Sequence, residues 1–226
     1  MQAHSHSSGF PVSKRTFAAF LKGRTIKVFL FIACSGFLAY PIMLLLFDPL
    51  ALGANPAEWM IRQWGDQALQ ILLLTLLISP LRMITHLNEW LRLRRMLGLF
   101  AFTALCLHVM AYVAFDRLFV LADIWTDLIK RPFITFGMIG FLMLLALAVT
   151  SSRMMVLRLG GDQWLRLHRL IYPASLLAIL HYWLMVKRDI SQPLLYACLL
   201  GVLLIVRLPV CQGWLKKSIS NQIKAA

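Results

Sequence analysis

The sequence predicts an all-α fold, an integral membrane bundle of six transmembrane helices. Hydrophobic residues make up 60% of the 226 residues and charged residues only 14%, which excludes an ordinary soluble domain. Apolar runs of about 20 residues, the length that crosses a hydrocarbon core, recur along the chain with basic residues between them. The net charge of +14 is therefore attributed to membrane orientation and not to nucleic-acid binding.

A basic tail opens the chain over residues 1–27. It lacks the short apolar core and cleavage site of a signal peptide, so the first apolar run is expected to remain as a helix. We expect spans at 28–47, 67–85, 97–115, 133–150, 168–186 and 193–211. These spans form one transmembrane domain over 28–211, with short connections, and a second basic tail follows at 212–226.

Lys and Arg are distributed unequally between the two sides of the expected bundle. If the amino terminus is cytoplasmic, the opposite side holds six of the 23 Lys and Arg residues and the cytoplasmic side holds the other 17. Basic residues are retained on the cytoplasmic side of membrane proteins. Both termini are therefore predicted to be cytoplasmic.

Two histidines fall at similar depths in spans that run in the same direction. His108 lies roughly 16 Å and His181 roughly 20 Å from the cytoplasmic side at 1.5 Å per residue. Two neutral imidazoles at matched heights can ligate one haem iron from opposite sides. Hydrogen bonding to a neighbouring helix is the alternative role for each of them.

His168 lies at the inner end of the fifth span, about 20 Å below His181, a suitable depth for a second haem. On one ideal helix these two rings would point about 140° apart, unless Pro173 redirects the helix. A solvated role at the membrane interface is equally open for His168. His86, at the inner end of the second span, is the other histidine available at this depth, and a structural role is favoured for it.

At the same inner depth, the third span carries Arg94 and Arg95 in place of a histidine. These arginines orient the chain in the membrane, and their guanidinium groups can also pair with haem propionates or a flavin phosphate. On the other side, Asp116, Asp123 and Asp127 form a candidate docking rim for a partner. The four cysteines are scattered without any Cys-x-x-Cys, which excludes a cysteine-based zinc or iron–sulfur motif.

From Leu52 to about Leu208 the sequence resembles the MsrQ family, within the ferric-reductase-like transmembrane superfamily. The order and spacing of short segments across all six spans carry the resemblance. These segments are Leu52–Pro56, Leu74–Leu81, Arg94–Leu99, Leu107-His108, Arg131-Pro132, Ala146–Ser151, Leu167-His168 with Tyr172, His181–Trp183 and Pro193–Ala197.

The resemblance implies a b-type cytochrome subunit of the bacterial inner membrane. Such a subunit carries electrons from the quinone pool to a periplasmic molybdopterin-dependent methionine sulfoxide reductase, which repairs oxidised methionine in envelope proteins. The resemblance also assigns His108 and His181 to an outer haem b and His168 to the inner haem position. At that inner position Arg94 and Arg95 replace the superfamily's partner histidine. FMN is implied as a further cofactor, and sulfoxide chemistry belongs to the partner.

The electron donor is expected to be quinol or a separate flavin reductase, because no Gly-rich dinucleotide fingerprint is visible. Two alternatives stay open. The chain could reduce metal chelates as a self-contained conduit, or it could be a non-redox protein in which His108 and His181 relay protons.

Overall fold

The computed structural model describes residues 23–186 and 189–207, and the regular elements in these ranges are helices. Four of them are long and apolar enough to cross a membrane. They are α2 (Arg24–Phe47), α3 (Pro56–Thr85), α4 (Leu91–Ala111) with its π-helical continuation η3 (Tyr112–Asp116), and α6 (Pro132–Val149). The apolar helices α9 (Ile171–Met185) and α10 (Ser191–Ile205) have 15 residues each, fewer than the usual span. A multi-pass helical bundle is confirmed.

The second span begins well before the expected start at residue 67. The Asn55 side chain accepts a hydrogen bond from the backbone N–H of Glu58 at 3.2 Å, and Pro56 occupies the first helical position. Both residues favour a helix start. The first turns of α3 are polar, so hydropathy alone does not register them.

The fifth span differs from the expected single helix over 168–186. His168 ends a separate helix, α8 (Gly161–His168), and the chain turns through Arg169 and Leu170 before α9 begins at Ile171. Pro173 explains this break, because its nitrogen cannot donate to the carbonyl of Arg169 and its ring crowds that carbonyl. His168 and His181 therefore stand on different helices, which corrects the expectation.

Short elements connect the long helices. They are η1 (Pro49–Leu52), η2 (Asn88–Trp90), α5 (Leu121–Lys130), α7 (Arg153–Leu159) and α8. The connection between α6 and α9 is thus a pair of short helices, longer than the short loop that was expected. The sixth span is described only as far as Arg207, so its expected end at residue 211 lies outside the described residues.

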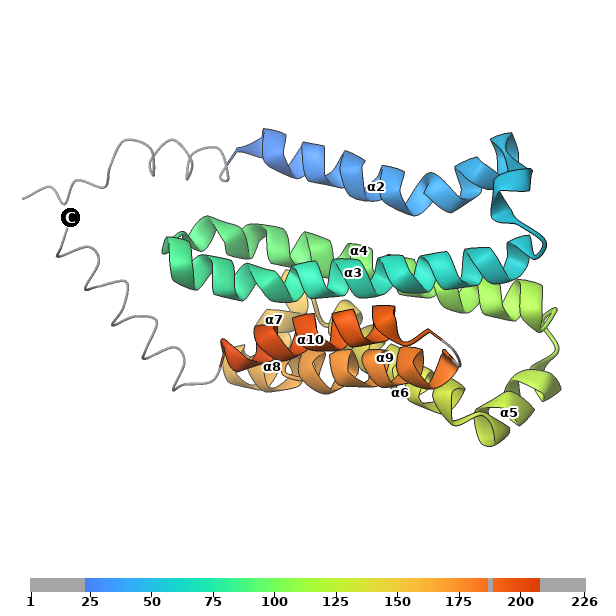
Figure 1. Cartoon of the computed structure of the whole chain (residues 1–226). Coiled ribbons are helices and arrows are strands. Elements are labelled where there is room, and N and C mark those ends of the chain that lie inside the picture. The colour runs from blue at the N-terminus through green and yellow to red at the C-terminus, as the bar shows by residue number, and fades with distance from the viewer. Residues whose placement is uncertain (1–22, 187–188, 208–226) are drawn as a thin grey trace, which may run out of the picture.

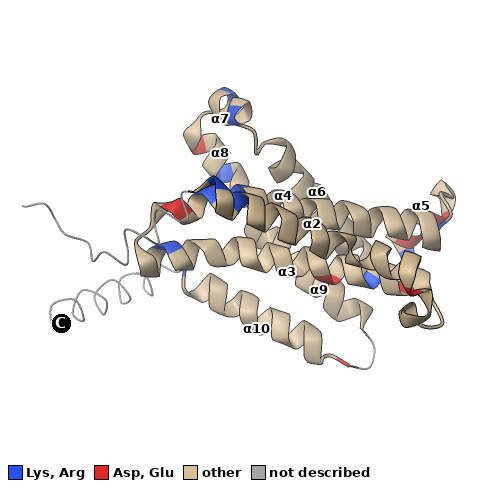
Figure 2. Ribbon diagram, turned by 90° about the horizontal axis from the view of Figure 1, so that it is seen from above, with Lys and Arg blue, Asp and Glu red and all other residues tan. Residues whose placement is uncertain are grey.

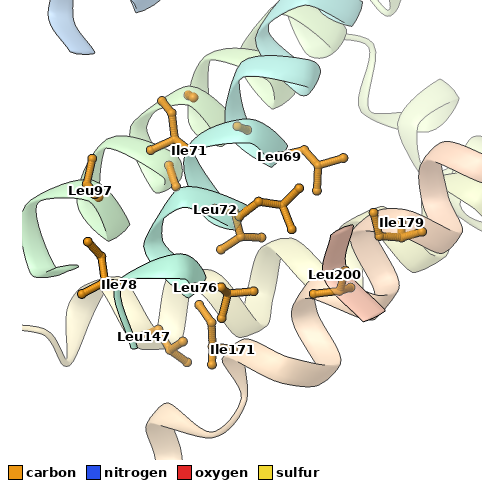
Figure 3. Close-up of a cluster of buried hydrophobic side chains, with 14 of the residues drawn as sticks. Leu69, Ile71, Leu72, Leu76, Ile78, Leu97, Leu147, Ile171, Ile179 and Leu200 are labelled. Carbon is orange, nitrogen blue, oxygen red and sulfur yellow. The ribbon is translucent and has the colours of Figure 1, made fainter. Parts of the chain in front are cut away.

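The centre of the bundle is α3. Half of the residues in its most apolar stretch are buried inside the protein, whereas in α2 the share is 11%. Figure 3 shows Leu72 and Leu76 of α3 facing Leu147 of α6, Ile171 of α9 and Leu200 of α10. α3 packs along α4, and α6 packs along α9, with much less contact between the two pairs (Figure 1). A site between the pairs can therefore be built from facing side chains.

The two ends of the bundle differ in their balance of charged residues, although each carries both signs (Figure 2). We call the end where α4 begins and where α7 and α8 lie the basic end; its elements carry Arg82, Arg92, Arg94, Arg95, Arg153, Arg158, Arg166 and Arg169, together with Glu89 and Asp162. We call the opposite end the acidic end; its elements carry Asp48, Glu58, Asp116, Asp123 and Asp127, together with Arg62, Arg117, Lys130 and Arg131.

Candidate haem-ligand site

His108 lies near the end of α4, and its ring reaches across to α3. The Nδ1 atom is 2.8 Å from the carbonyl oxygen of Ile61. A carbonyl only accepts, so Nδ1 carries the proton and donates. This hydrogen bond fixes the tautomer and leaves Nε2 with a lone pair, as in metal-ligating histidines.

His181 repeats this arrangement in the other helix pair. On α9, its Nδ1 donates to the carbonyl oxygen of Phe133 at the start of α6, at 2.7 Å. The Nε2 atom of His181 is therefore also left as the available nitrogen. Both histidines are partly buried near the acidic end of the bundle.

A glycine lies against each histidine ring, one helical turn after the accepting carbonyl. A Cβ atom added at Gly65 would lie 3.0 Å from Nδ1 of His108, and one added at Gly137 would lie 2.8 Å from Nδ1 of His181. Separations this short force a shift of ring or helix. The absence of a side chain at these two positions is what admits the imidazoles to their carbonyl partners.

The two rings face one another across the helix pairs. Their centroids are 6.1 Å apart, and their planes are nearly perpendicular at 83°. A metal–imidazole bond is about 2 Å long and the ring centroid lies about 1 Å behind the nitrogen, so two histidines on one iron have centroids about 6 Å apart. The separation of His108 and His181 fits a single iron held by both.

Within residues 23–186 and 189–207, no three His, Cys, Asp or Glu side chains come together as a metal site. A haem iron needs only two axial protein ligands, because the porphyrin supplies the other four. A two-histidine centre therefore suits haem better than a metal bound by protein ligands alone.

His168 has a different environment at the basic end. Its ring stacks on Trp164 of the same helix, with centroids 3.8 Å apart, and its Nδ1 is 3.1 Å from the Trp164 carbonyl oxygen. The Trp164 indole N–H in turn donates to the Thr150 carbonyl at 2.9 Å. Burial, and secondarily the positive charge of Arg94, lower the pKa of His168 below its ordinary value and favour the neutral imidazole.

The predicted arginines separate in the structure. Arg94 is partly buried and close enough to His168 to influence its charge, whereas Arg95 is exposed. His86 is exposed and ends α3 in the left-handed conformation, with φ 58°, consistent with a structural role.

One member of the expected acidic docking rim is turned inward. Asp127 is 7% exposed and accepts a hydrogen bond from the Tyr112 hydroxyl at 2.7 Å. It also pairs with Arg117 Nε at 2.6 Å and Arg131 Nε at 3.1 Å. Asp127 is therefore an internal tie between α4, α5 and α6, and not a surface docking residue.

The supports of the two histidines were not predicted from the sequence; they are Gly65, Gly137 and the carbonyls of Ile61 and Phe133. A signal was available, since a glycine inside an apolar spanning helix often marks close approach of another group. Which histidine each glycine meets depends on the packing of the helix pairs, and the sequence does not reveal that pairing.

Comparison with known proteins identifies the family to which this chain belongs. Residues 64–179 match the family described as "Ferric reductase like transmembrane component", a region that contains both glycines, His108 and His168. A relative from Rhodospirillum rubrum is 52% identical over 157 residues, which are 70% of this chain and 76% of the relative. One from Herminiimonas arsenicoxydans is 47% identical over 174 residues, 76% and 79% of the two chains. The chain belongs to the MsrQ family.

A third MsrQ relative, from Caulobacter vibrioides, is 44% identical over 156 residues, 69% of this chain and 74% of the relative. All three relatives are named as the heme-binding subunit MsrQ of a protein-methionine-sulfoxide reductase. Membership of the MsrQ family agrees with the resemblance that the sequence segments indicated.

Proposed function

We propose that this MsrQ-family chain is the b-type cytochrome subunit of a methionine sulfoxide reductase system, and that His108 and His181 ligate one haem b. The observation that carries the proposal is the matched pair of imidazoles 6.1 Å apart, each oriented by a carbonyl of another helix. Haem would supply one-electron chemistry in the bundle. The carbonyls of Ile61 and Phe133 hold the two imidazoles in place, and the surrounding helices exclude water from them.

At the basic end, His168 is the proposed ligand of a second haem, and no second histidine ligand is proposed because His86, also at this end, is exposed. Arg94 lies close to it and suits the propionate carboxylates of such a haem. Arg95, which is exposed, is proposed to contribute to orientation in the membrane. Two haems at opposite ends would form a path along the bundle.

All six apolar helices are proposed to cross a bacterial inner membrane, with both chain termini and the basic end in the cytoplasm. The short helices α9 and α10 pack against helices that are long enough to span the membrane, which supports the proposal that they cross it too. The basic end carries most of the described Arg residues, as the positive-inside rule requires (Figure 2). The paired histidines then lie toward the periplasm.

Electrons are proposed to enter at the basic end and leave at the acidic end. Quinol or a separate flavin reductase is the proposed donor, and a periplasmic molybdopterin-dependent methionine sulfoxide reductase is the proposed acceptor. FMN is proposed from the family resemblance alone and is assigned to no residue. The chain itself has no proposed catalytic residue for sulfoxide reduction.

The test is the optical spectrum of the purified protein, oxidised and dithionite-reduced, with pyridine haemochrome quantitation. We expect a b-type spectrum, loss of one haem per chain in His108→Ala and in His181→Ala, and loss of the other in His168→Ala. His86→Asn is the control and should keep both haems, because His86 is exposed and asparagine tolerates its left-handed backbone conformation.

A colourless wild-type protein after haem-supplemented expression would overturn the cytochrome function and favour a proton relay through His108 and His181. Reduction of ferric chelates at full rate, in cells that lack the reductase partner, would instead favour a self-contained metal-chelate reductase.

A further inference from the structure

We propose that α5 is an interfacial anchor whose exposed apolar sector binds the acyl chains of the lipid leaflet at the acidic end. Figure 1 shows α5 at that end of the bundle, beside the start of α6. The side chains of Leu121, Trp125 and Ile129 are 78%, 66% and 69% exposed. At 100° per residue they lie within about 80° of one another and form one continuous apolar sector.

A second exposed sector of α5 is polar. Asp123, Thr126 and Lys130 are exposed and fall within about 60° of one another, well away from the apolar sector. The third sector, with Ile124 and Leu128, packs toward the protein. A helix with separate apolar and polar exposed sectors lies along a membrane–water boundary, where Trp is also favoured.

The position of α5 along the chain favours lipid as the occupant. A single residue, Arg131, separates α5 from α6, and α6 is long and apolar enough to cross the membrane. The end of α5 is therefore held at the level where the spanning helix enters the bilayer. At that level a sideways apolar sector meets acyl chains, and the polar sector meets headgroups and water.

The rotation of α5 about its axis is fixed by the protein. Asp127 points inward and joins Tyr112 at the end of α4 to Arg117 and Arg131. Turning the apolar sector inward would pull this buried carboxylate away from all three partners, which is costly. Exposure of Leu121, Trp125 and Ile129 is therefore a fixed property of the fold.

The turn before α5 exposes two more apolar side chains. Leu118 and Phe119 have φ values of 48° and 61°, in the left-handed region that bulky residues rarely adopt. Both side chains are largely exposed. The backbone of this turn thus bears strain while it presents apolar groups next to the anchor helix.

The experiment is site-directed labelling of the full chain, with its four native cysteines replaced by alanine. Trp125→Cys and Ile129→Cys report on the apolar sector, and Thr126→Cys is the matched neighbour on the polar sector. Each variant is labelled with a membrane-impermeant maleimide in spheroplasts, with and without the coexpressed reductase partner. Labelling in SDS confirms that every cysteine is reactive, and gel-filtration profiles in detergent confirm folding.

We expect Thr126→Cys to react at least about tenfold faster than Trp125→Cys and Ile129→Cys, whether or not the partner is present. In vesicles of phosphatidylethanolamine and phosphatidylglycerol, a spin label at position 125 should be relaxed more by oxygen than by a nickel chelate, and a label at position 126 the reverse. Fast labelling at all three positions would overturn the proposal.

Protection of Trp125→Cys only when the partner is present would identify the apolar sector as a protein-docking face and would also overturn lipid binding. This interpretation of the labels relies on the proposed periplasmic position of the acidic end, so the reaction is repeated in inside-out membrane vesicles; slow labelling at position 126 in both preparations would show that the whole helix is embedded, which contradicts a boundary position. None of these outcomes depends on haem content, so they are separate from the test of the cytochrome function.

Discussion

The histidines at the two ends of the bundle obtain their orientation in different ways. His108 and His181 each donate to a carbonyl of another helix, 47 and 48 residues earlier in the chain. His168 contacts the carbonyl and ring of Trp164, four residues earlier on its own helix. The paired site thus exists only after the helices have packed, whereas His168 has a contact within α8 in addition to its neighbours Leu147 on α6 and Arg94 on α4.

The acidic-end site is also built twice from the same parts. In each helix pair an accepting carbonyl is followed one turn later by a glycine that admits the ring: Ile61 with Gly65, and Phe133 with Gly137. Two separate pairs that present equivalent histidines suit a cofactor held symmetrically between them. At the basic end, His168 lies near Arg94, and the other described histidine there, His86, is exposed and ends α3.

The largest effect is expected from Asp127→Asn, because the acidic-end geometry depends on this buried tie. Tyr112 lies one turn after His108, and Arg131 lies two residues before Phe133, so Asp127 joins the supports of both histidines. Loss of the charge leaves Arg117 with the more exposed Asp116 as its remaining counter-ion. We expect unfolding to be easier by about 3 kcal/mol, measured as a lower melting temperature in detergent.

Asp123→Asn is the matched control, since it removes an exposed carboxylate from the same helix. Its effect should stay within about 0.5 kcal/mol. Equal destabilisation by the two substitutions would mean that net charge, and not the Asp127 tie, stabilises this end. The haem proposed at His168 should be unaffected by Asp127→Asn. A change in its content would show that the two ends of the bundle are not independent.

The next effect is expected from Gly137→Ala. The new methyl group would lie 2.8 Å from His181 Nδ1, so the ring must leave the Phe133 carbonyl. Loss of an orienting hydrogen bond typically weakens metal binding about 10–100-fold, and we expect that loss of affinity for the His108–His181 haem. Gly65→Ala should fall at the lower end of this range, because its methyl group would lie 3.0 Å from His108. Haem titration of the apoprotein measures both.

Gly140→Ala tests whether these effects come from the histidine contact. Gly140 lies on the same helix as Gly137, and a Cβ there would meet its nearest neighbour at an ordinary 3.6 Å. Its haem affinity should match that of the wild type. If Gly140→Ala weakens haem binding as much as Gly137→Ala, general helix packing is responsible.

Hydropathy and charge were sufficient to predict the all-helical membrane bundle and four of its long helices, because burial in lipid demands long apolar runs. The matched depth of His108 and His181 also followed from helical rise. The early start of α3 and the break before α9 were missed, since both arise from local capping and Pro173 and not from hydropathy. The inward turn of Asp127 could not be predicted, because its three partners come together only in the folded bundle.

The smallest effect is expected at the basic end, where Arg94→Gln removes a positive charge near His168. A cation near a haem stabilises the added electron, so its loss should lower the midpoint potential of the haem proposed at His168. Two unit charges about 16 Å apart at an effective dielectric constant of 20 interact by about 1 kcal/mol, which corresponds to about 40 mV for one electron, and a shorter separation would give a larger shift. Redox titration of the two haems measures this shift, and the His108–His181 haem should be unchanged.

Arg95→Gln is the control for this last prediction, because it removes the same charge from an exposed neighbour that water and salt screen. Its effect on the His168 haem should be well below that of Arg94→Gln. Equal shifts from both substitutions would show that the basic end acts through its overall charge. A selective shift from Arg94→Gln would mean that the partly buried Arg94 acts locally on the haem proposed at His168.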